Sequence, residues 1–387
     1  MLFRGWGESV DGRWPDVATV VDHAGVGHLV VTRHALVRRV LTDPVTFRPD
    51  NALEAVTPMP VAALRVLAGH RFRLPPTLAN NSGASHPEIR GIVADALHPT
   101  RVAAQQPWLT ALVRERVDRL AAALDAGQAV DLYAELAADL PLLVLARLVE
   151  LPDAPVGAVK AFARAALELF WAPLDADRQR TLATEVGRFH TVLRAFAATG
   201  GGLAARLRAA GHSPDVVVGA LFFLLVAGQE TTSQFLTLLL HRLTGEPAVR
   251  ARLRAGEVAV TDVVEEGLRL EPPIVTWRRV AAVDTTLGGT KVPAGTSIVA
   301  WLARAGRDPE VVAAPAEFRP GQRGSRGHLA FGAGAHRCVG AHLARMEAAV
   351  VVAEAAALLD GVTVVRAPWC PDNLTFRMPD AFVIRRP

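Results

Sequence analysis

Several residue types are scarce in this chain of 387 residues, and each scarcity excludes a class of protein. The two cysteines, Cys338 and Cys370, are too few for a disulfide framework and fit a reducing compartment. Only Lys160 and Lys291 are lysines, and the arginines form no basic run of the kind that binds nucleic acid. We therefore expect a cytoplasmic protein with no nucleic-acid partner.

Long apolar segments are missing as well. The longest apolar run, residues 216–228, is too short to span a bilayer and predicts a buried helix rather than a membrane span. The first residues lack the apolar core of a signal peptide, so we expect no export. Hydrophobic residues make up 51% of the chain and charged residues 21%, which permits a large core and argues against disorder.

Helical patterns dominate what is present. Residues 213–243 predict one long helix that is apolar on nearly every face and should cross the middle of the core. Beyond residue 273, short β-like runs alternate with Gly and Pro, and no repeat or Ser/Gly linker divides the chain. We predict one large domain over residues 1–387, mainly α with small β-sheets. The other predicted elements are a strand at 28–32 and helices at 34–43, 86–97, 103–124, 131–150, 154–170, 178–198 and 340–359.

Cys338 lies in a glycine-rich segment directly before a helical pattern that begins at about Val339. Glycine lets the backbone pass close to a flat ligand, and the N–H groups of a helix start favour a thiolate. These features leave three interpretations open. The thiol could be an inert buried group, a nucleophile with His336 as its base, or a zinc ligand with His336 and His342.

Residues 331–340, FGAGAHRCVG, resemble the haem-binding loop of the cytochrome P450 family, and every fixed position of Phe-Gly-x-Gly-x-His-x-Cys-x-Gly is filled. The resemblance implies a P450-like fold with a long central helix over the haem. It also implies a haem b whose iron is held by the Cys338 thiolate, with Phe331 and Gly332 against the cofactor.

A second segment, AGQETT at residues 227–232, is by itself consistent with an ordinary helix that has a polar flank. It resembles the oxygen-activation motif of the same family. The resemblance implies that Thr231 positions water and the bound oxygen, that Glu230 relays protons, and that Ala227 lies against the haem.

HPEIR places His86 and Arg90 on one helix face, a spacing that a surface pair would also have. In the family a His-x-x-x-Arg pair holds the haem propionates, and Arg279 and His336 match further propionate partners. Arg278 is a rival for the role of Arg279, and His328 is a weaker candidate.

EEGLR allows either Glu265 or Glu266 to pair with Arg269, and spacing alone predicts a solvated surface pair. The resemblance selects Glu266 and Arg269 as the family's Glu-x-x-Arg pair, with Arg323 as the third member. This network would serve folding rather than catalysis.

The resemblance runs from about His28 to the C-terminus, with four motifs in order. It implies a monooxygenase that hydroxylates, epoxidises or couples a hydrophobic small molecule, free or carrier-bound, in secondary metabolism. No dinucleotide fingerprint is present, so electrons should come from an external ferredoxin or flavodoxin and its reductase. Arg90, Arg337 and Arg345 could form a basic docking face, although each is as well explained by packing or solvation.

Other interpretations remain beside this one: a peroxide-driven peroxygenase, a haem-thiolate binding protein without turnover, and a cysteine hydrolase. Residues 57–85 match no motif and are expected to form a lid over the substrate. Cys370 is expected to be a buried bystander. The expected substrate-pocket positions, each of which could equally be plain core, are Leu224, Ala227, Val275, Thr276 and Phe376.

Overall fold

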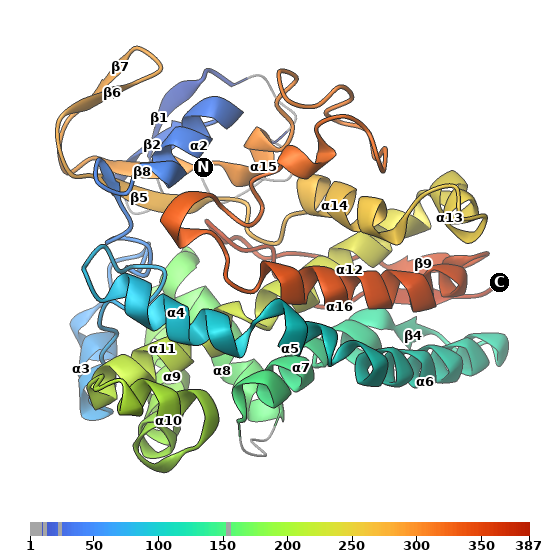
Figure 1. Ribbon diagram of the computed structural model, residues 1–387, viewed down its shortest axis with the longest axis horizontal. Helices are drawn as coiled ribbons and strands as arrows, with labels where there is room; N and C mark the ends of the chain where they lie inside the picture. The colour runs from blue at the N-terminus through green and yellow to red at the C-terminus, as the bar shows by residue number, and fades with distance from the viewer. Residues whose placement is uncertain (1–9, 11–13, 22–24, 152–155) are drawn as a thin grey trace.

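The computed structural model describes residue 10 and residues 14–21, 25–151 and 156–387. Helices form most of the molecule, and small sheets lie at its edges (Figure 1). The prediction of a mainly α fold with small β-sheets is confirmed. Residues 154 and 155, where one predicted helix was expected to begin, lie outside the described residues.

The helices fall close to the ranges that apolar periodicity predicts. Helix α4, for example, follows Ser85 and carries Pro87 in its first turn, where a missing N–H is tolerated. The principal helices are α2 (His34–Thr42), α3 (Val61–Gly69), α4 (His86–Ala96), α5 (Pro99–Ala103), α6 (Gln106–Asp125), α7 (Leu140–Val149), α8 (Val156–Trp171), α9 (Ala176–Thr199), α10 (Gly202–Ala209), α11 (Pro214–Ala227), α12 (Glu230–Thr244), α13 (Pro247–Arg254), α14 (Val260–Leu270), α15 (Leu302–Ala305) and α16 (Ala341–Ala355).

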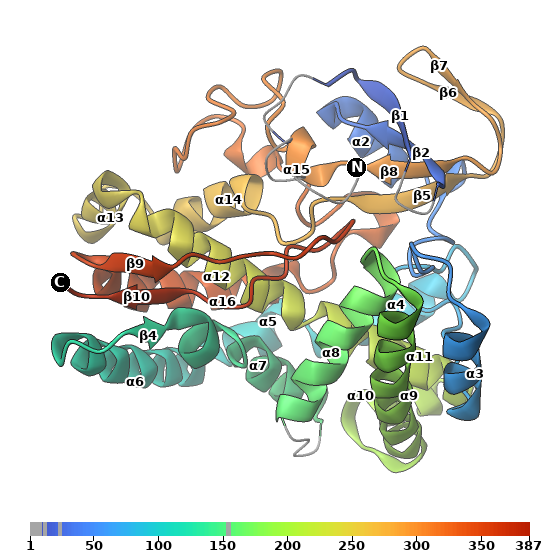
Figure 2. The same cartoon turned by 180° about the vertical axis from the view of Figure 1, so that it is seen from behind.

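The largest sheet has five strands in the order β1-β2-β8-β5-β3. Its strands are β1 (Val17–Val21), β2 (Gly27–Val31), β3 (Phe47–Arg48), β5 (Trp277–Ala281) and β8 (Ser297–Ala300). Smaller sheets pair β6 (Thr285–Leu287) with β7 (Thr290–Val292), and β10 (Val383–Arg385) with β4 (Val130–Asp131) and β9 (Thr363–Arg366). Figures 1 and 2 show the five-stranded sheet above the helical body and the C-terminal sheet beside α6 and α16.

The predicted central helix is interrupted. The segment forms α11 and α12, which are separated by Gly228 and Gln229. Gln229 has φ −132°, outside the helical range, and the Thr231 hydroxyl donates to the Ala227 carbonyl at 2.8 Å across the break. By length and composition, residues 214–244 could cross a membrane, but 72% of the most apolar window is buried inside the fold, as expected of a core helix.

Two other predictions need correction. The predicted helix at 131–150 is divided into strand β4, a π-helical turn at Tyr133–Ala137 and α7. The Asp131 carboxylate accepts hydrogen bonds from the backbone N–H groups of Tyr133 and Phe382, which holds this stretch against the C-terminal sheet. The loop at 57–85 contains helix α3, which packs on α9.

A cavity beside Cys338

An internal cavity lies between α12, the segment at 330–340 and the first turn of α16. It encloses about 1420 Å³ of space outside protein atoms, including its open mouth. Elements from distant parts of the chain line it, namely α4, α11, α12, β5 and α16. The cavity is therefore built from segments that meet only in the folded chain.

The cysteine loop is shaped by two glycines in the left-handed region. Gly332 has φ 66° and Gly334 has φ 71°, values that other residues rarely adopt. A Cβ at Gly334 would lie 2.8 Å from the carbonyl oxygen of Leu41, so the glycine also permits close packing on α2. The Cys338 N–H donates to the Phe331 carbonyl at 2.8 Å, which closes the loop. The following helix begins at Ala341, two residues later than predicted.

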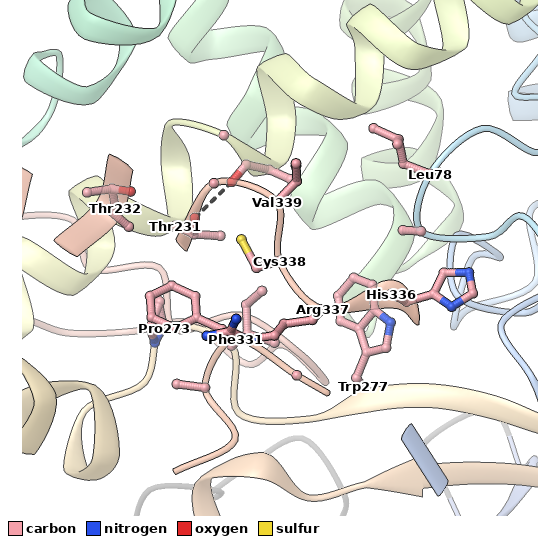
Figure 3. A pocket seen from close by; sticks show the side chains of 18 of the residues that line it. Leu78, Thr231, Thr232, Pro273, Trp277, Phe331, His336, Arg337, Cys338 and Val339 are labelled. Carbon is pink, nitrogen blue, oxygen red and sulfur yellow. Dashed lines mark hydrogen bonds between the residues drawn. The ribbon is translucent and has the colours of Figure 1, made fainter. Parts of the chain in front are cut away.

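The Cys338 side chain is exposed only to this internal cavity, and it lies in the centre of the view in Figure 3. Burial raises the pKa of the Cys338 thiol, although the Gly340 N–H and the charges of Arg90, Arg337 and Arg345 act in the opposite direction. The N–H group at the helix start thus acts in the expected direction, but burial outweighs it. A cation in the cavity is needed to stabilise the sulfur as an anion.

Arg279 is the most deeply buried charged side chain of the described cavity lining. It is 2% exposed, and its guanidinium donates only to the carbonyl of Arg278 among the described residues. Burial lowers the pKa of Arg279 to about 10. The neighbouring Arg278 points to the other face of β5 and donates to the Glu54 carbonyl. Arg279 is thus the member of the pair that faces the cavity, as the resemblance implied.

His336 provides a second unpartnered polar group. Its Nε2 lies 2.9 Å from the Asn81 carbonyl, whereas its buried Nδ1 has no hydrogen-bond partner among the described residues. Burial lowers the pKa of His336 to about 4. His86 stacks on this ring at 4.2 Å and does not itself line the cavity, so it supports His336 instead of facing the ligand.

Arg90 lines the cavity and donates to the Arg337 carbonyl at 2.6 Å. His328 lies outside the cavity lining and its Nε2 is 3.1 Å from a Glu265 oxygen, so the structure does not bring it into the site. Phe331, Gly332 and Ala227 do line the cavity, as the resemblance implied.

These residues fit a haem. The cavity offers one thiol, backbone that can approach a flat ring, and two arginines without carboxylate partners, the buried Arg279 and the half-buried Arg90, which could hold two propionates. A zinc site does not fit, because the described residues contain no group of three or more His, Cys, Asp or Glu side chains that could hold a metal ion.

Thr231 and Glu230 point in different directions, although they are adjacent in sequence. Thr231 lines the cavity near Cys338 (Figure 3), whereas Glu230 is 0% exposed and faces α8. There its carboxylate forms ion pairs with Lys160 and, at 3.6 Å, with Arg164. Burial lowers the pKa of Lys160, and Glu230 opposes that shift. Sequence reasoning missed Lys160, because the two residues are 70 positions apart.

The Glu266–Arg269 pair is buried rather than solvated. Arg269 makes two hydrogen bonds to Glu266, at 2.7 and 2.9 Å, and Glu265 pairs instead with Arg345 and His328. The predicted third member is wrong: Arg323 is exposed and makes no hydrogen bond to Glu266. The network is completed by Gln322 Nε2 and Ser325 Oγ, both 2.6 Å from Glu266 oxygens, and by the Arg319 N–H.

Three of the five predicted substrate-pocket positions line the cavity. Leu224, Ala227 and Phe376 line the cavity, but Val275 and Thr276 do not. The Thr276 hydroxyl instead donates to the Leu374 carbonyl at 2.6 Å. Trp277 was missed, although alternation along β5 puts it on the same face as Arg279.

Comparison with known proteins agrees with this geometry. A model of the cytochrome P450 family matches residues 208–355. Putative cytochrome P450 123 of Mycobacterium bovis is 31% identical over 289 residues, which are 73% of this chain and 71% of that protein. The chain belongs to the cytochrome P450 family. Its match to cytochrome P450 144 of Mycobacterium tuberculosis, at 32% identity over 252 residues, spans 62% of this chain and 57% of that relative.

Among solved P450 structures, cytochrome P450 CREJ in complex with (4-ethylphenyl) dihydrogen phosphate superposes with a TM-score of 0.89. It is 26% identical, and the match covers 95% of this chain and 94% of that one. The likeness therefore extends over the sheet, the helical body and the cysteine loop of the P450 fold.

Proposed function

We propose that this P450 is a haem-thiolate monooxygenase that inserts one oxygen atom of O₂ into an apolar small molecule. The observation that carries the proposal is the meeting of Cys338, Thr231, the half-buried Arg90 and the buried Arg279 around one cavity. Cys338 would hold the iron, and Arg90, Arg279 and His336 would hold the propionates. When bound, the haem supplies O₂ activation, which the electron donation of a thiolate favours.

The chain's own residues supply the binding and the proton handling. Thr231 lines the cavity, and its hydroxyl donates a hydrogen bond to the Ala227 carbonyl that it can exchange for another acceptor in the cavity. The Glu230 carboxylate lies on the opposite side of the same helical turn, where it is paired with Lys160. Delivery of a proton toward the cavity would need the Glu230 carboxylate to leave Lys160, or a water to bridge the helix break at Gly228 and Gln229.

An apolar substrate is favoured by the lining away from Cys338. Leu78, Phe223, Leu224 and Ile274 are apolar, and Trp277 and Phe376 meet edge to face at 6.4 Å. The cationic side chains of the described lining, Arg90, Arg279 and Arg337, are the ones that a haem would engage or that lie on the cysteine loop. An anionic substrate like the phosphate ester bound to CREJ would find no separate cation, so we propose a neutral, partly aromatic molecule.

Electrons would come from a ferredoxin or flavodoxin. Arg337 beside Cys338 is a candidate contact for an acidic carrier, whereas Arg345 is engaged with Glu265 and with the Phe331 ring. A role in secondary metabolism, with a free or carrier-bound substrate, completes the proposal.

The test is haem reconstitution followed by a spectral screen. The reduced carbon monoxide adduct should carry the absorption signature of an anionic sulfur ligand, and Cys338→His should lose that signature while it still binds haem. Neutral aromatic ligands should shift the haem absorption and stimulate substrate-linked O₂ uptake with a ferredoxin system. A colourless protein would contradict the proposal. Product formed with peroxide alone, at a rate rivalling the ferredoxin-driven rate, would point to a peroxygenase.

A further inference from the structure

His190 is a buried imidazole that the proposed mechanism leaves unused. It lies on α9 and is not among the described residues that line the cavity. The residue is 1% exposed, and neither ring nitrogen has a hydrogen-bond partner of good geometry in the described part of the chain. Burying a polar group without such a partner is costly, and burying a charge is costlier still. The site therefore tolerates a neutral ring and opposes a protonated one.

One aromatic side chain, that of Phe72, covers His190. The two rings are tilted, and their centroids lie 4.8 Å apart. Phe72 also meets Phe222 of α11 at 5.7 Å and Phe170 of α8 at 6.3 Å. All of these contacts bury apolar ring surface, which favours the inserted position of Phe72. A single side chain from the segment after α3 thus attaches that segment to α8, α9 and α11.

Phe72 belongs to a segment that reaches the cavity. Residues 70–79, which we call the roof segment, follow α3, and Figure 2 shows α3 beside α9. The roof segment crosses α11 so closely that a Cβ at Gly219 would lie 3.2 Å from the Pro75 side chain. It ends at residues that line the cavity, among them Leu78 (Figure 3). Moving the roof segment away from α11 would therefore remove part of the cavity wall.

At the protein surface the start of the roof segment is held by weaker contacts. The Nδ1 atom of His70 lies 3.1 Å from the Thr191 hydroxyl oxygen, and the exposed Arg73 lies 3.8 Å from Asp215. Exposed polar pairs of this kind contribute little to stability. Arg71 has φ 53°, in the left-handed region that is unfavourable for a residue with a side chain. The buried aromatic contact is therefore the attachment on which this turn chiefly depends.

The charges that face His190 do not compensate a positive ring. Burial lowers the pKa of His190, and Arg194 on the same helix acts in the same direction. Asp215 of α11 and the backbone of His70 and Arg73 act in the opposite direction, but burial outweighs them. The Asp215 carboxylate is moreover paired with Arg194 at 3.0 Å. A proton on His190 thus disfavours the arrangement in which Phe72 covers the ring.

We propose that His190 and Phe72 form a pH-sensitive latch, which holds the roof segment over the cavity at neutral pH and releases it in mild acid. When Phe72 withdraws, water reaches the imidazole, and the ring can take up a proton. Because its pKa is lowered in the closed state, His190 favours closure fully above its ordinary pKa of about 6.5, and this contribution is lost as the pH falls below that value. The consequence for ligand access rests on the proposed function, whereas the latch itself does not.

Amide hydrogen exchange of the haem-loaded protein tests the latch without turnover. Protection factors, which are corrected for the intrinsic pH dependence of exchange, should fall about tenfold in the roof segment between pH 7.5 and pH 5.5. The Phe72 N–H, bonded to the Leu67 carbonyl at 3.0 Å, is one such amide. In His190→Leu the protection should be equal at the two pH values. His70→Asn is the matched control, because it removes a histidine at the surface of the same turn and should keep the wild-type pH dependence.

Two exchange results would overturn the latch: protection of the roof segment that is independent of pH in the wild type, or a pH dependence that survives in His190→Leu. Phe72→Ala is a second variant that leaves the histidine in place. It should lower the protection of the roof segment at both pH values, since the ring that covers His190 is gone. Wild-type protection in Phe72→Ala would show that this side chain does not hold the segment.

Ligand entry tests the consequence for the cavity. The association rate of tert-butyl isocyanide, an uncharged haem ligand, should rise about tenfold from pH 7.5 to pH 5.5 in the wild type and stay constant in His190→Leu. His336 does not interfere, because its pKa of about 4 keeps it neutral over this range. A constant rate in the wild type would refute the control of access even if exchange shows the latch. Failure of the wild type to bind the isocyanide would count against the proposed function alone, and the exchange result would still decide the latch.

Discussion

Lys160 is a rare residue type in this arginine-rich chain, and its contacts determine the surroundings of Glu230. It is one of two lysines, and its ammonium contacts Glu230, Gln229 and Ser233 behind the helix break. A compact ammonium suits this space because it can donate to three acceptors around one point. The partners of Glu230 are therefore placed to control whether its carboxylate can turn toward the cavity.

Lys160→Met should destabilise the protein by about 3–5 kcal/mol, because it leaves the buried Glu230 with only the longer Arg164 contact. Equilibrium denaturation measures the change. Lys291→Met is the natural control, since Lys291 is exposed on β7 and its loss should change stability by less than about 0.5 kcal/mol. Equal effects of the two substitutions would show that the Glu230 ion pair contributes little.

Thr231→Val should leave folding close to wild type but divert electrons from product to hydrogen peroxide, because the cavity loses its best-placed hydroxyl. Thr237→Val is the matched control. Thr237 makes the same 2.8 Å bond to a carbonyl on α12, but it does not line the cavity. Peroxide release and product yield per electron measure the effect. Unchanged coupling in Thr231→Val, or equal uncoupling in Thr237→Val, would contradict the role of Thr231.

Helix α14 is held in place by a segment that comes about 40–60 residues later in the chain. Arg269 donates to the carbonyls of Gly306, Pro315 and Glu317, and Glu266 accepts from Gln322 and Ser325. This buried network ties the irregular chain before the cysteine loop to α14. The position of Cys338 thus depends on an element that contributes little to the cavity wall itself.

Arg269→Ala should therefore abolish most folded, haem-loaded protein, since it leaves Glu266 buried without its cation, a loss of about 3–5 kcal/mol. Arg323→Ala, in the same segment but exposed, should change stability by less than about 0.5 kcal/mol. Yield of haem-loaded protein and denaturation midpoints measure both variants. A stable Arg269→Ala variant would mean that the network is dispensable.

Glu265, on the same helix, should give the protein a stability that depends on acid pH. Burial alone would raise the pKa of Glu265, but hydrogen bonds from His328 and Arg345 outweigh it and lower the pKa to about 2. A carboxyl with a lowered folded-state pKa contributes stability that is fully present above about pH 4.5 and is lost as the pH falls toward 2. The full contribution is roughly 3 kcal/mol.

Glu265→Gln should accordingly be less stable than wild type at pH near 6, and the difference should shrink as the pH is lowered toward about 3. Denaturation curves of both proteins across that range measure it. A difference that stays constant with pH would show that Glu265 has an ordinary pKa in the folded state.

Over the whole molecule, the cavity is assembled from segments that meet only in the folded chain. Arg90 comes from α4, Arg279 from β5 and Cys338 from the loop before α16. A ligand that binds all three stabilises the folded state by mass action. Haem binding should therefore raise the free energy of unfolding, in addition to its role in the chemistry.

Arg279→Leu should weaken haem retention and lower the haem-dependent rise in Tm, because a buried propionate would lose its cation. Haem transfer to an external acceptor protein and melting curves with and without haem measure the effect. His98→Leu, at the N-terminus of α5 and outside the cavity, is a surface control that should leave retention unchanged. Equal retention in Arg279→Leu would remove Arg279 from the haem site.

The sequence by itself determined the helical class, the cysteine loop and the family, because these depend on local periodicity and on contiguous motifs. The glycines at 332 and 334 and the spacing of His336 and Cys338 can be interpreted without knowing what packs on them. The alternation along β5 would also have placed Trp277 beside Arg279, had it been applied.

Only the tertiary structure decided which way the polar groups face and what they meet. Glu230 faces Lys160, and Gln322 and Ser325 occupy the place by Glu266 that was predicted for Arg323. The reason is physical: the free energy of a buried charge depends on partners brought in from other segments, and a local pattern carries no information about those partners.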